Sequence, residues 1–163
     1  HAVPGGEDGL MSETSRKPEL TELLCFDIYA ASRAVTAVYR HVLAELGLTY
    51  PQYLVLVVLW DKQTCTINGL RDLLHLDYGT LTPLLRRMES RGLLTRQRRG
   101  DDERSVQIEL TDAGLELEPR ARHVQGVVRQ AVGLTYEQAA TLQDTLRKVT
   151  ESATDYAVGV GHD

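Results

Sequence analysis

The amino-acid sequence predicts a mainly α fold with a small β-wing, in which a winged helix-turn-helix is flanked by N- and C-terminal helices. Three patterns in the 163 residues carry this prediction. Apolar residues recur every three or four positions over most of the chain, as amphipathic helices require. Two short helical segments follow one another across a tight turn near the middle of the chain. The segment from Ser105 to Leu110 alternates polar and apolar residues, which is typical of a strand with one buried face.

The first predicted helix occupies residues 20–46 and ends at Gly47. Its apolar positions have spacings of three and four, and they are Leu20, Leu23, Leu24, Ile28, Ala31, Val35, Val38, Val42 and Leu46. Thr49 and Gln52 then have the spacing of a capping box, so a second helix is expected to begin here and to run to about Trp60. Its many apolar residues predict that it is largely buried.

Two capping residues mark the helix-turn-helix. Thr66 can cap a short helix with apolar residues at helical spacing, and Asp77 is a good cap for the next helix, from Tyr78 to Ser90. Residues 93–97 then lead into an arginine-rich tip at 98–102, and the alternating segment returns from it. The two extended segments and their polar tip predict a β-hairpin wing.

Two further helices are expected after the wing. Thr111 or Asp112 caps the first of them, which runs toward Val132. Thr135 and Gln138 form a second capping box and open the last helix. Its apolar face is Ala139, Leu142, Leu146 and Val149.

Bulk composition limits the class of protein. With 42% apolar residues, residues 18–157 can form a single domain with a real core. The longest apolar stretch, Tyr53 to Trp60, is far shorter than the roughly 20 residues of a membrane span, and no signal pattern opens the chain. A soluble, cytoplasmic protein is therefore expected. Residues 1–17, Gly-rich at first, are expected to be a disordered leader or an expression remnant.

The charge is distributed unevenly. The net charge of −5 argues against a nonspecific coat on nucleic acid. Between Arg86 and Arg104, however, seven arginines stand against four acidic residues. Such a local basic segment fits a small DNA-contacting module, although a run of charge is more often only a solvated surface.

No metal site or cofactor is expected. Two cysteines are too few and too unpatterned for a zinc site or a disulfide scaffold, so a reducing compartment fits best. His41, His75 and His123 fall in separate predicted elements without the spacing of metal ligands.

Cys25 stands out because two tyrosines share its side of the first helix. Tyr29 and Tyr39 both come within about 40° of Cys25 around the helix axis. Tyr39 nevertheless lies about 21 Å along the axis, so it can reach a thiol only if that thiol belongs to a partner chain. The plainer interpretation is a buried cysteine that acts as a small hydrophobic residue, with tyrosines that pack an interface.

Five segments together resemble the MarR family of dimeric winged-helix regulators. Within it the four segments before the wing are similar to the organic-hydroperoxide-sensing repressors of the one-cysteine type, the OhrR subfamily, whereas the wing sequence is typical of the MarR family as a whole. The segments are Leu24–Phe26, Tyr29–Arg33, Thr49–Leu54, Leu76–Leu85 and the wing sequence Asp101–Ser105 followed by Leu110–Gly114. The resemblance implies a homodimer in which residues 18–47 and 112–157 are dimerisation helices and residues 49–110 form the DNA-binding lobe.

The same resemblance implies a redox-sensing repressor. Reduced protein would hold a palindromic operator, and oxidation of Cys25 by an organic hydroperoxide would release the DNA. Tyr29 and Tyr39 would support the thiolate, since hydroxyl groups that hydrogen-bond to sulfur favour its anionic form. No cysteine follows Cys65, unlike in two-cysteine members, so the sulfenic acid would be captured by a small cellular thiol or oxidised further. Cys65 itself is expected to be a structural or surface residue.

The predicted DNA contacts come from the second helix of the helix-turn-helix and from the wing. Tyr78, Thr80 and Thr82 lie at the helix N-terminus, where side chains normally meet base edges, and Arg86 and Arg87 are expected to meet phosphates. The resemblance adds the wing contacts: Arg104 in the minor groove, Asp102 holding it, and Arg98 and Arg99 on the backbone.

Two other functions remain open at this stage. One is a MarR-type repressor released by an apolar small molecule, with Cys25 incidental. The other is a thiol peroxidase, for which a resolving route and an activated site would be needed. Arg33, two turns beyond Cys25, is the nearest candidate for such an assisting group.

Overall fold

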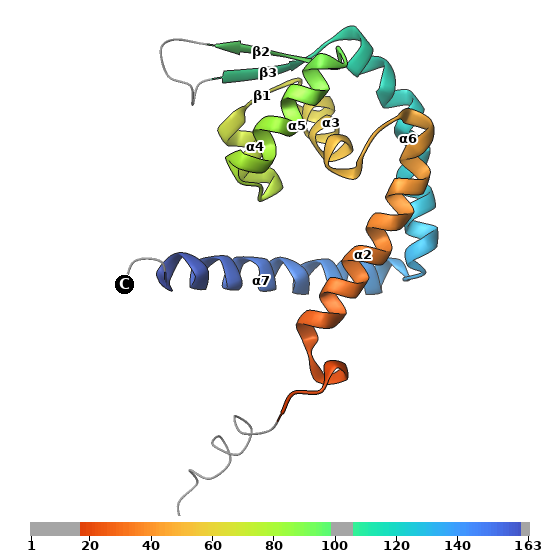
Figure 1. The fold of residues 1–163 in the computed structure, drawn as a ribbon. Coiled ribbons are helices and arrows are strands. Elements are labelled where there is room, and N and C mark those ends of the chain that lie inside the picture. The colour runs from red at the N-terminus through yellow and green to blue at the C-terminus, as the bar shows by residue number, and fades with distance from the viewer. Residues whose placement is uncertain (1–16, 99–105, 161–163) are drawn as a thin grey trace, which may run out of the picture.

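The computed structural model describes residues 17–98 and 106–160. In Figure 1, α3, α4 and α5 gather beneath the strands in one lobe, while α2 and α6 lie side by side and extend away from it. Helix α7 continues from the far end of α6 as a long, separate rod. The elements, in chain order, are η1 Leu20–Glu22, α2 Leu24–Leu43, η2 Ala44–Leu46, α3 Tyr50–Lys62, β1 Thr64–Thr66, α4 Ile67–Leu74, α5 Tyr78–Ser90, β2 Leu94–Arg98, β3 Val106–Leu110, α6 Asp112–Val132 and α7 Tyr136–Val160.

The first helix is shorter than the prediction. Residues 20–22 form a separate 3₁₀ turn, and α2 begins only at Leu24. The reason is local, because Leu23 has an extended backbone and no side-chain oxygen with which to cap a helix. At the other end the predicted stop is confirmed, since Gly47 has a φ of 63°, which glycine adopts without a steric penalty.

The other helices begin at the capping residues that the sequence predicted. Thr49 and Gln52 form the reciprocal capping box of α3. Thr66, Asp77 and Thr111 each accept a backbone N–H in the first turns of α4, α5 and α6. The second capping box, between Thr135 and Gln138, opens α7. Each cap satisfies a donor that would otherwise have no partner within the helix.

The wing contains one strand more than the sequence predicted. The order in the antiparallel sheet is β1-β3-β2, and Cys65 at the centre of β1 lies opposite Ile108 of β3. Three residues are too short to show an alternating pattern, so β1 had no signal in the sequence. Strands β2 and β3 match the predicted hairpin within one residue at each end.

The core is one cluster of buried side chains that extends from α3, α4, α5 and the inner face of the sheet to α2 and α6. Its fully buried side chains include Leu56, Leu70, Leu85, Met88 and Ile108. No single helix among the described residues is long and apolar enough to cross a membrane, and only the bent pair 24–46 and 50–62 has sufficient length and composition together.

The wing joins α6 through a glycine packed against the backbone. A Cβ on Gly114 would lie 2.2 Å from the carbonyl oxygen of Leu93 and 2.9 Å from Cδ2 of Leu110. The carbonyl of Gly114 also accepts a hydrogen bond from the indole of Trp60, at 3.0 Å. The base of the wing therefore has no space for a side chain at this position.

We expect Gly114→Ala to lower the free energy of unfolding by about 1–3 kcal/mol, because backbone must move to admit the methyl group. Gly126→Ala is the matched control in the same helix, since a Cβ there meets nothing within 4 Å. That change should stabilise the protein by about 0.5–1 kcal/mol through helix propensity. Urea titrations followed by circular dichroism would measure both values, and equal effects would contradict the crowding at Gly114.

Candidate functional site: a surface cysteine and a DNA-reading helix

Cys25 lies on the surface, in the first turn of α2. One turn further, Tyr29 is 58% exposed, and its phenol oxygen accepts a hydrogen bond of 3.0 Å from Arg33. The Arg33 guanidinium also lies 5.6 Å from the centre of the Tyr29 ring. Four large apolar side chains nearby are exposed as well: Leu20, Leu23, Leu24 and Phe26. A thiol on an uncovered apolar surface is accessible to an oxidant and to a partner chain.

Tyr39 lies near the other end of α2 in a different environment. Only 7% of it is exposed, and its ring stacks on Tyr50 of α3 with 4.1 Å between ring centres. Tyr53, also of α3, lies 5.8 Å away. Burial raises the pKa of the Tyr39 hydroxyl above its usual value, so this group keeps its proton at neutral pH. Within one chain it is about 21 Å along the helix from Cys25, too far for contact.

Tyr50 was not among the predicted site residues, although it packs directly on one of them. The sequence places it 11 positions after Tyr39, across the break between α2 and α3. Helical periodicity cannot relate residues on two sides of a turn. The packing of α3 on α2 is what brings the two rings together.

The N-terminus of α5 presents the predicted base-reading residues. Tyr78 and Thr80 are exposed, and Thr82 is half-buried. The Tyr78 hydroxyl donates to the side-chain oxygen of Asn68 on α4, and the guanidinium of Arg71 lies 5.0 Å from the Tyr78 ring centre. The tyrosine is thus anchored to the preceding helix, and its oxygen remains available as an acceptor.

Two arginines of the basic segment have structural partners. Arg91 donates to the carbonyl of Gly47 at 2.6 Å and so ties α5 to the end of the first helical segment. Arg96 forms an ion pair of 2.7 Å with Glu89, and this hydrogen-bonded partner lowers the pKa of the Glu89 carboxyl. The charge count from the sequence therefore overstates the charge available to DNA.

The other arginines of this segment lie on the lobe surface. Arg86 and Arg87 are exposed on α5, and Arg98 is exposed at the end of β2. A basic recognition helix next to a basic strand gives the lobe the groups that commonly meet phosphates. The remaining predicted wing residues lie outside the described residues: Arg99, Asp102 and Arg104.

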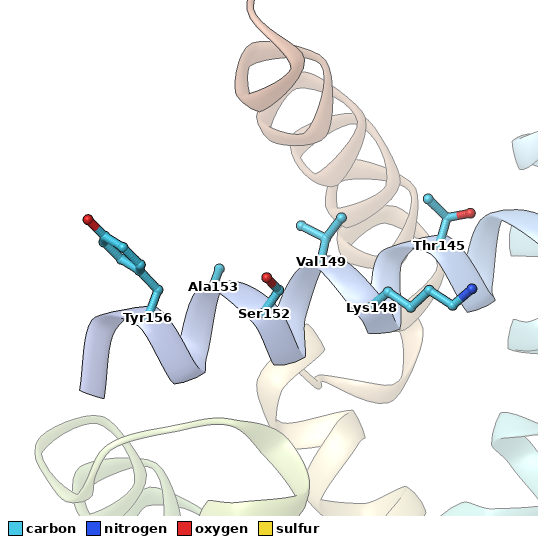
Figure 2. A pocket seen from close by; sticks show the side chains of 6 residues that line it. All are labelled: Thr145, Lys148, Val149, Ser152, Ala153 and Tyr156. Atoms are coloured by element: carbon cyan, nitrogen blue, oxygen red, sulfur yellow. The ribbon is translucent and has the colours of Figure 1, made fainter. Parts of the chain in front are cut away.

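Helix α7 leaves its apolar face uncovered in the single chain. It buries none of its side chains, although it is 25 residues long. Figure 2 shows a hollow whose lining comes from this helix alone. The lining residues are Thr145, Lys148, Val149, Ser152, Ala153 and Tyr156. One helix cannot enclose a small molecule, so this hollow lacks the enclosure that a small-molecule pocket needs. Over the described residues, no cluster of His, Cys, Asp and Glu could hold a metal ion.

Cys65 is expected to react more slowly than Cys25 with an alkylating agent. It lies half-buried in β1, and this burial raises its pKa above the usual value, so the thiolate forms only at higher pH. We expect iodoacetamide at neutral pH to label Cys25 before Cys65, as judged by peptide mass spectrometry. Faster labelling of Cys65 would contradict the prediction, and Cys65→Ser serves as the control for peptide assignment.

These features define a winged helix-turn-helix DNA-binding protein with a surface cysteine in a flanking helix. Comparison with known proteins makes the assignment more specific, because the family of the transcriptional regulators SarA and Rot matches residues 37–118. The chain belongs to the MarR family of winged-helix transcriptional regulators.

Three relatives show the range of the similarity. The organic hydroperoxide resistance transcriptional regulator of Bacillus subtilis is 44% identical over 77% of this chain and 83% of its own length. The structure of reduced AbfR bound to DNA has a TM-score of 0.70 and 32% identity, covering 88% of this chain and 99% of that one. AbfR comes from Staphylococcus epidermidis. The reduced form of MarR from Escherichia coli has a TM-score of 0.62 and 26% identity, over 82% and 98% of the two chains.

Proposed function

We propose that this regulator is a repressor that senses organic hydroperoxides. As a reduced homodimer it binds palindromic operator DNA, and it releases the operator when a hydroperoxide oxidises Cys25. The observation that carries the proposal is an exposed cysteine on an apolar surface of α2, in the helix that also carries the buried Tyr39. The name of the Bacillus subtilis relative supports the choice of oxidant.

The chemistry at Cys25 balances without a cofactor. The thiolate sulfur attacks one peroxide oxygen, the O–O bond breaks, and the leaving alkoxide takes up a proton to become an alcohol. The sulfur gives up two electrons and becomes a sulfenic acid. A low-molecular-weight thiol then attacks this sulfur, forming a mixed disulfide and water. A second small thiol attacks the mixed disulfide, leaves as part of a small-molecule disulfide and restores the Cys25 thiol, so that the protein can bind the operator again.

Dimer formation places the thiol and the second tyrosine together. The uncovered apolar faces of α2 and α7 are the surfaces on which a second copy would pack. In such a dimer Tyr29 of one chain and Tyr39 of the other donate hydrogen bonds to the same sulfur and favour its thiolate. Because its proposed partner is operator DNA, we expect the protein to act in the cytoplasm.

Release follows from the geometry of two half-sites. Helix α2 packs on α6, and the N-terminus of α6 adjoins the wing. A rearrangement at Cys25 would therefore be transmitted through α6 to the base of the lobe. The two recognition helices must meet half-sites about one DNA turn apart, and a small rotation prevents simultaneous docking. AbfR has been determined reduced and overoxidized on DNA and with a disulfide formed, which supports redox control within this family.

Operator binding by wild-type protein tests the proposal. Fluorescence anisotropy on a palindromic operator fragment should show tight binding under reducing conditions, loss after a slight excess of cumene hydroperoxide, and recovery with added thiol. Binding that ignores the oxidant but responds to a phenolic ligand would favour the small-molecule alternative. Sustained peroxide consumption with a reductant would favour a peroxidase.

A further inference from the structure

One glutamine connects the buried tyrosine to two other helices. Gln125 lies on α6, and its side-chain nitrogen donates to the Tyr39 hydroxyl at 3.3 Å and to the Tyr53 hydroxyl at 3.0 Å. Tyr39 belongs to α2 and Tyr53 to α3, so a single amide holds three helices at this point. Neither the periodicity of the chain nor the resemblance pointed to this residue.

Gln125 is the donor in both hydrogen bonds, so neither bond uses the hydroxyl proton of a tyrosine. A phenol has one proton to donate and an oxygen that accepts, whereas an amide nitrogen only donates. Gln125 therefore occupies the acceptor side of the Tyr39 oxygen, and the hydroxyl proton remains available for another acceptor. A hydroxyl whose oxygen accepts a hydrogen bond is also polarised toward stronger donation.

The ring of Tyr39 cannot turn away from this arrangement easily. Tyr50 stacks on it, and Tyr53 packs against it at an angle of 38°. With the ring fixed, the amide determines how the hydroxyl is oriented. We propose that Gln125 is a positioning residue for the thiol: it holds the Tyr39 hydroxyl with its proton directed outward, toward Cys25 of the partner subunit. This inference rests on the proposed function.

Exchanging the donor for an acceptor is the direct test. In Gln125→Glu a carboxylate replaces the amide and accepts a hydrogen bond from the Tyr39 hydroxyl, so that this hydroxyl no longer donates to the thiol. The apparent pKa of Cys25 should rise by about one unit, so that cumene hydroperoxide reacts about tenfold more slowly at neutral pH. The pH dependence of Cys25 alkylation by iodoacetamide, measured in the intact Cys65→Ser dimer, reports this pKa.

Two further variants guard against a general loss of structure. Gln125→Met keeps the side-chain length without a donor and should raise the pKa in the same direction by less. Gln130→Glu makes the same charge change five residues further along α6, about 140° around the helix axis from Gln125. It should leave the pKa within about 0.2 unit of wild type, as expected for a screened surface charge. Size-exclusion chromatography confirms that each variant is assembled like the wild type.

Tyr39→Phe shows whether the effect passes through the tyrosine. On that background Gln125→Glu should cause no further rise, because the hydroxyl that the amide positions is absent. Equal pKa values for Gln125→Glu and Gln130→Glu, or a rise that persists with Phe at position 39, would overturn the inference. A wild-type Cys25 that fails to react with hydroperoxide would instead overturn the proposed function, so the two failures are distinguishable.

Discussion

Cys25→Ser protein is expected to remain on operator DNA at a concentration of cumene hydroperoxide that removes the wild type. A serine hydroxyl is not ionised at neutral pH and cannot take up the peroxide oxygen as a sulfur does. Wild-type affinity should fall about 1,000-fold, from specific to nonspecific binding, whereas the variant should stay within about twofold of its untreated affinity. Anisotropy titrations at one fixed salt concentration measure both values, because salt alone changes binding to DNA.

Cys65→Ser is the matched control for this result. It makes the same chemical change at the other cysteine, which is half-buried and whose pKa burial raises. This protein should lose the operator under oxidant and recover it with thiol, as the wild type does. Release of the Cys25→Ser protein by oxidant would show that Cys25 is structural and would direct attention to a small-molecule effector.

Local capping chemistry explains why the order of the elements was predictable. Thr49, Asp77 and Thr111 begin their helices in the structure as they do in the sequence pattern, because a cap and its N–H partner are three residues apart. The start of α2 was misplaced since Leu20 and Leu23 continue the apolar period through residues that lack a cap. Apolar spacing reports which side is buried and not where a helix begins.

The site was less predictable because its contacts cross between elements. The pairing of Arg96 with Glu89 joins β2 to α5, and that of Arg91 with Gly47 joins residues 44 positions apart. Charge counting along the chain included both arginines in the basic segment and could not show that they have partners within the protein. Gln125 and Tyr50 meet Tyr39 only after α2, α3 and α6 pack together. Such contacts depend on tertiary packing, which no local period encodes.

A negative charge in the middle of the α7 apolar face is expected to abolish both the dimer and operator binding. Leu146 lies between Leu142 and Val149 on this face, and all three are exposed in the single chain. An interface that buries these side chains would also bury the carboxylate of Leu146→Asp. Removing an unpaired carboxylate from water costs several kcal/mol. The free chain should keep its fold, because α7 buries none of its side chains within it.

Ala140→Asp provides the control, since position 140 is exposed on the opposite side of α7 and receives the same charge. Light scattering should give a monomer mass for Leu146→Asp and a dimer mass for Ala140→Asp. A monomer meets one half-site only, so its operator affinity should fall about 1,000-fold, while the control binds as the wild type does. A Leu146→Asp protein that remains dimeric and binds normally would exclude α7 from the interface. The thiol and Tyr39 would then have to meet across an interface that α2 forms without α7.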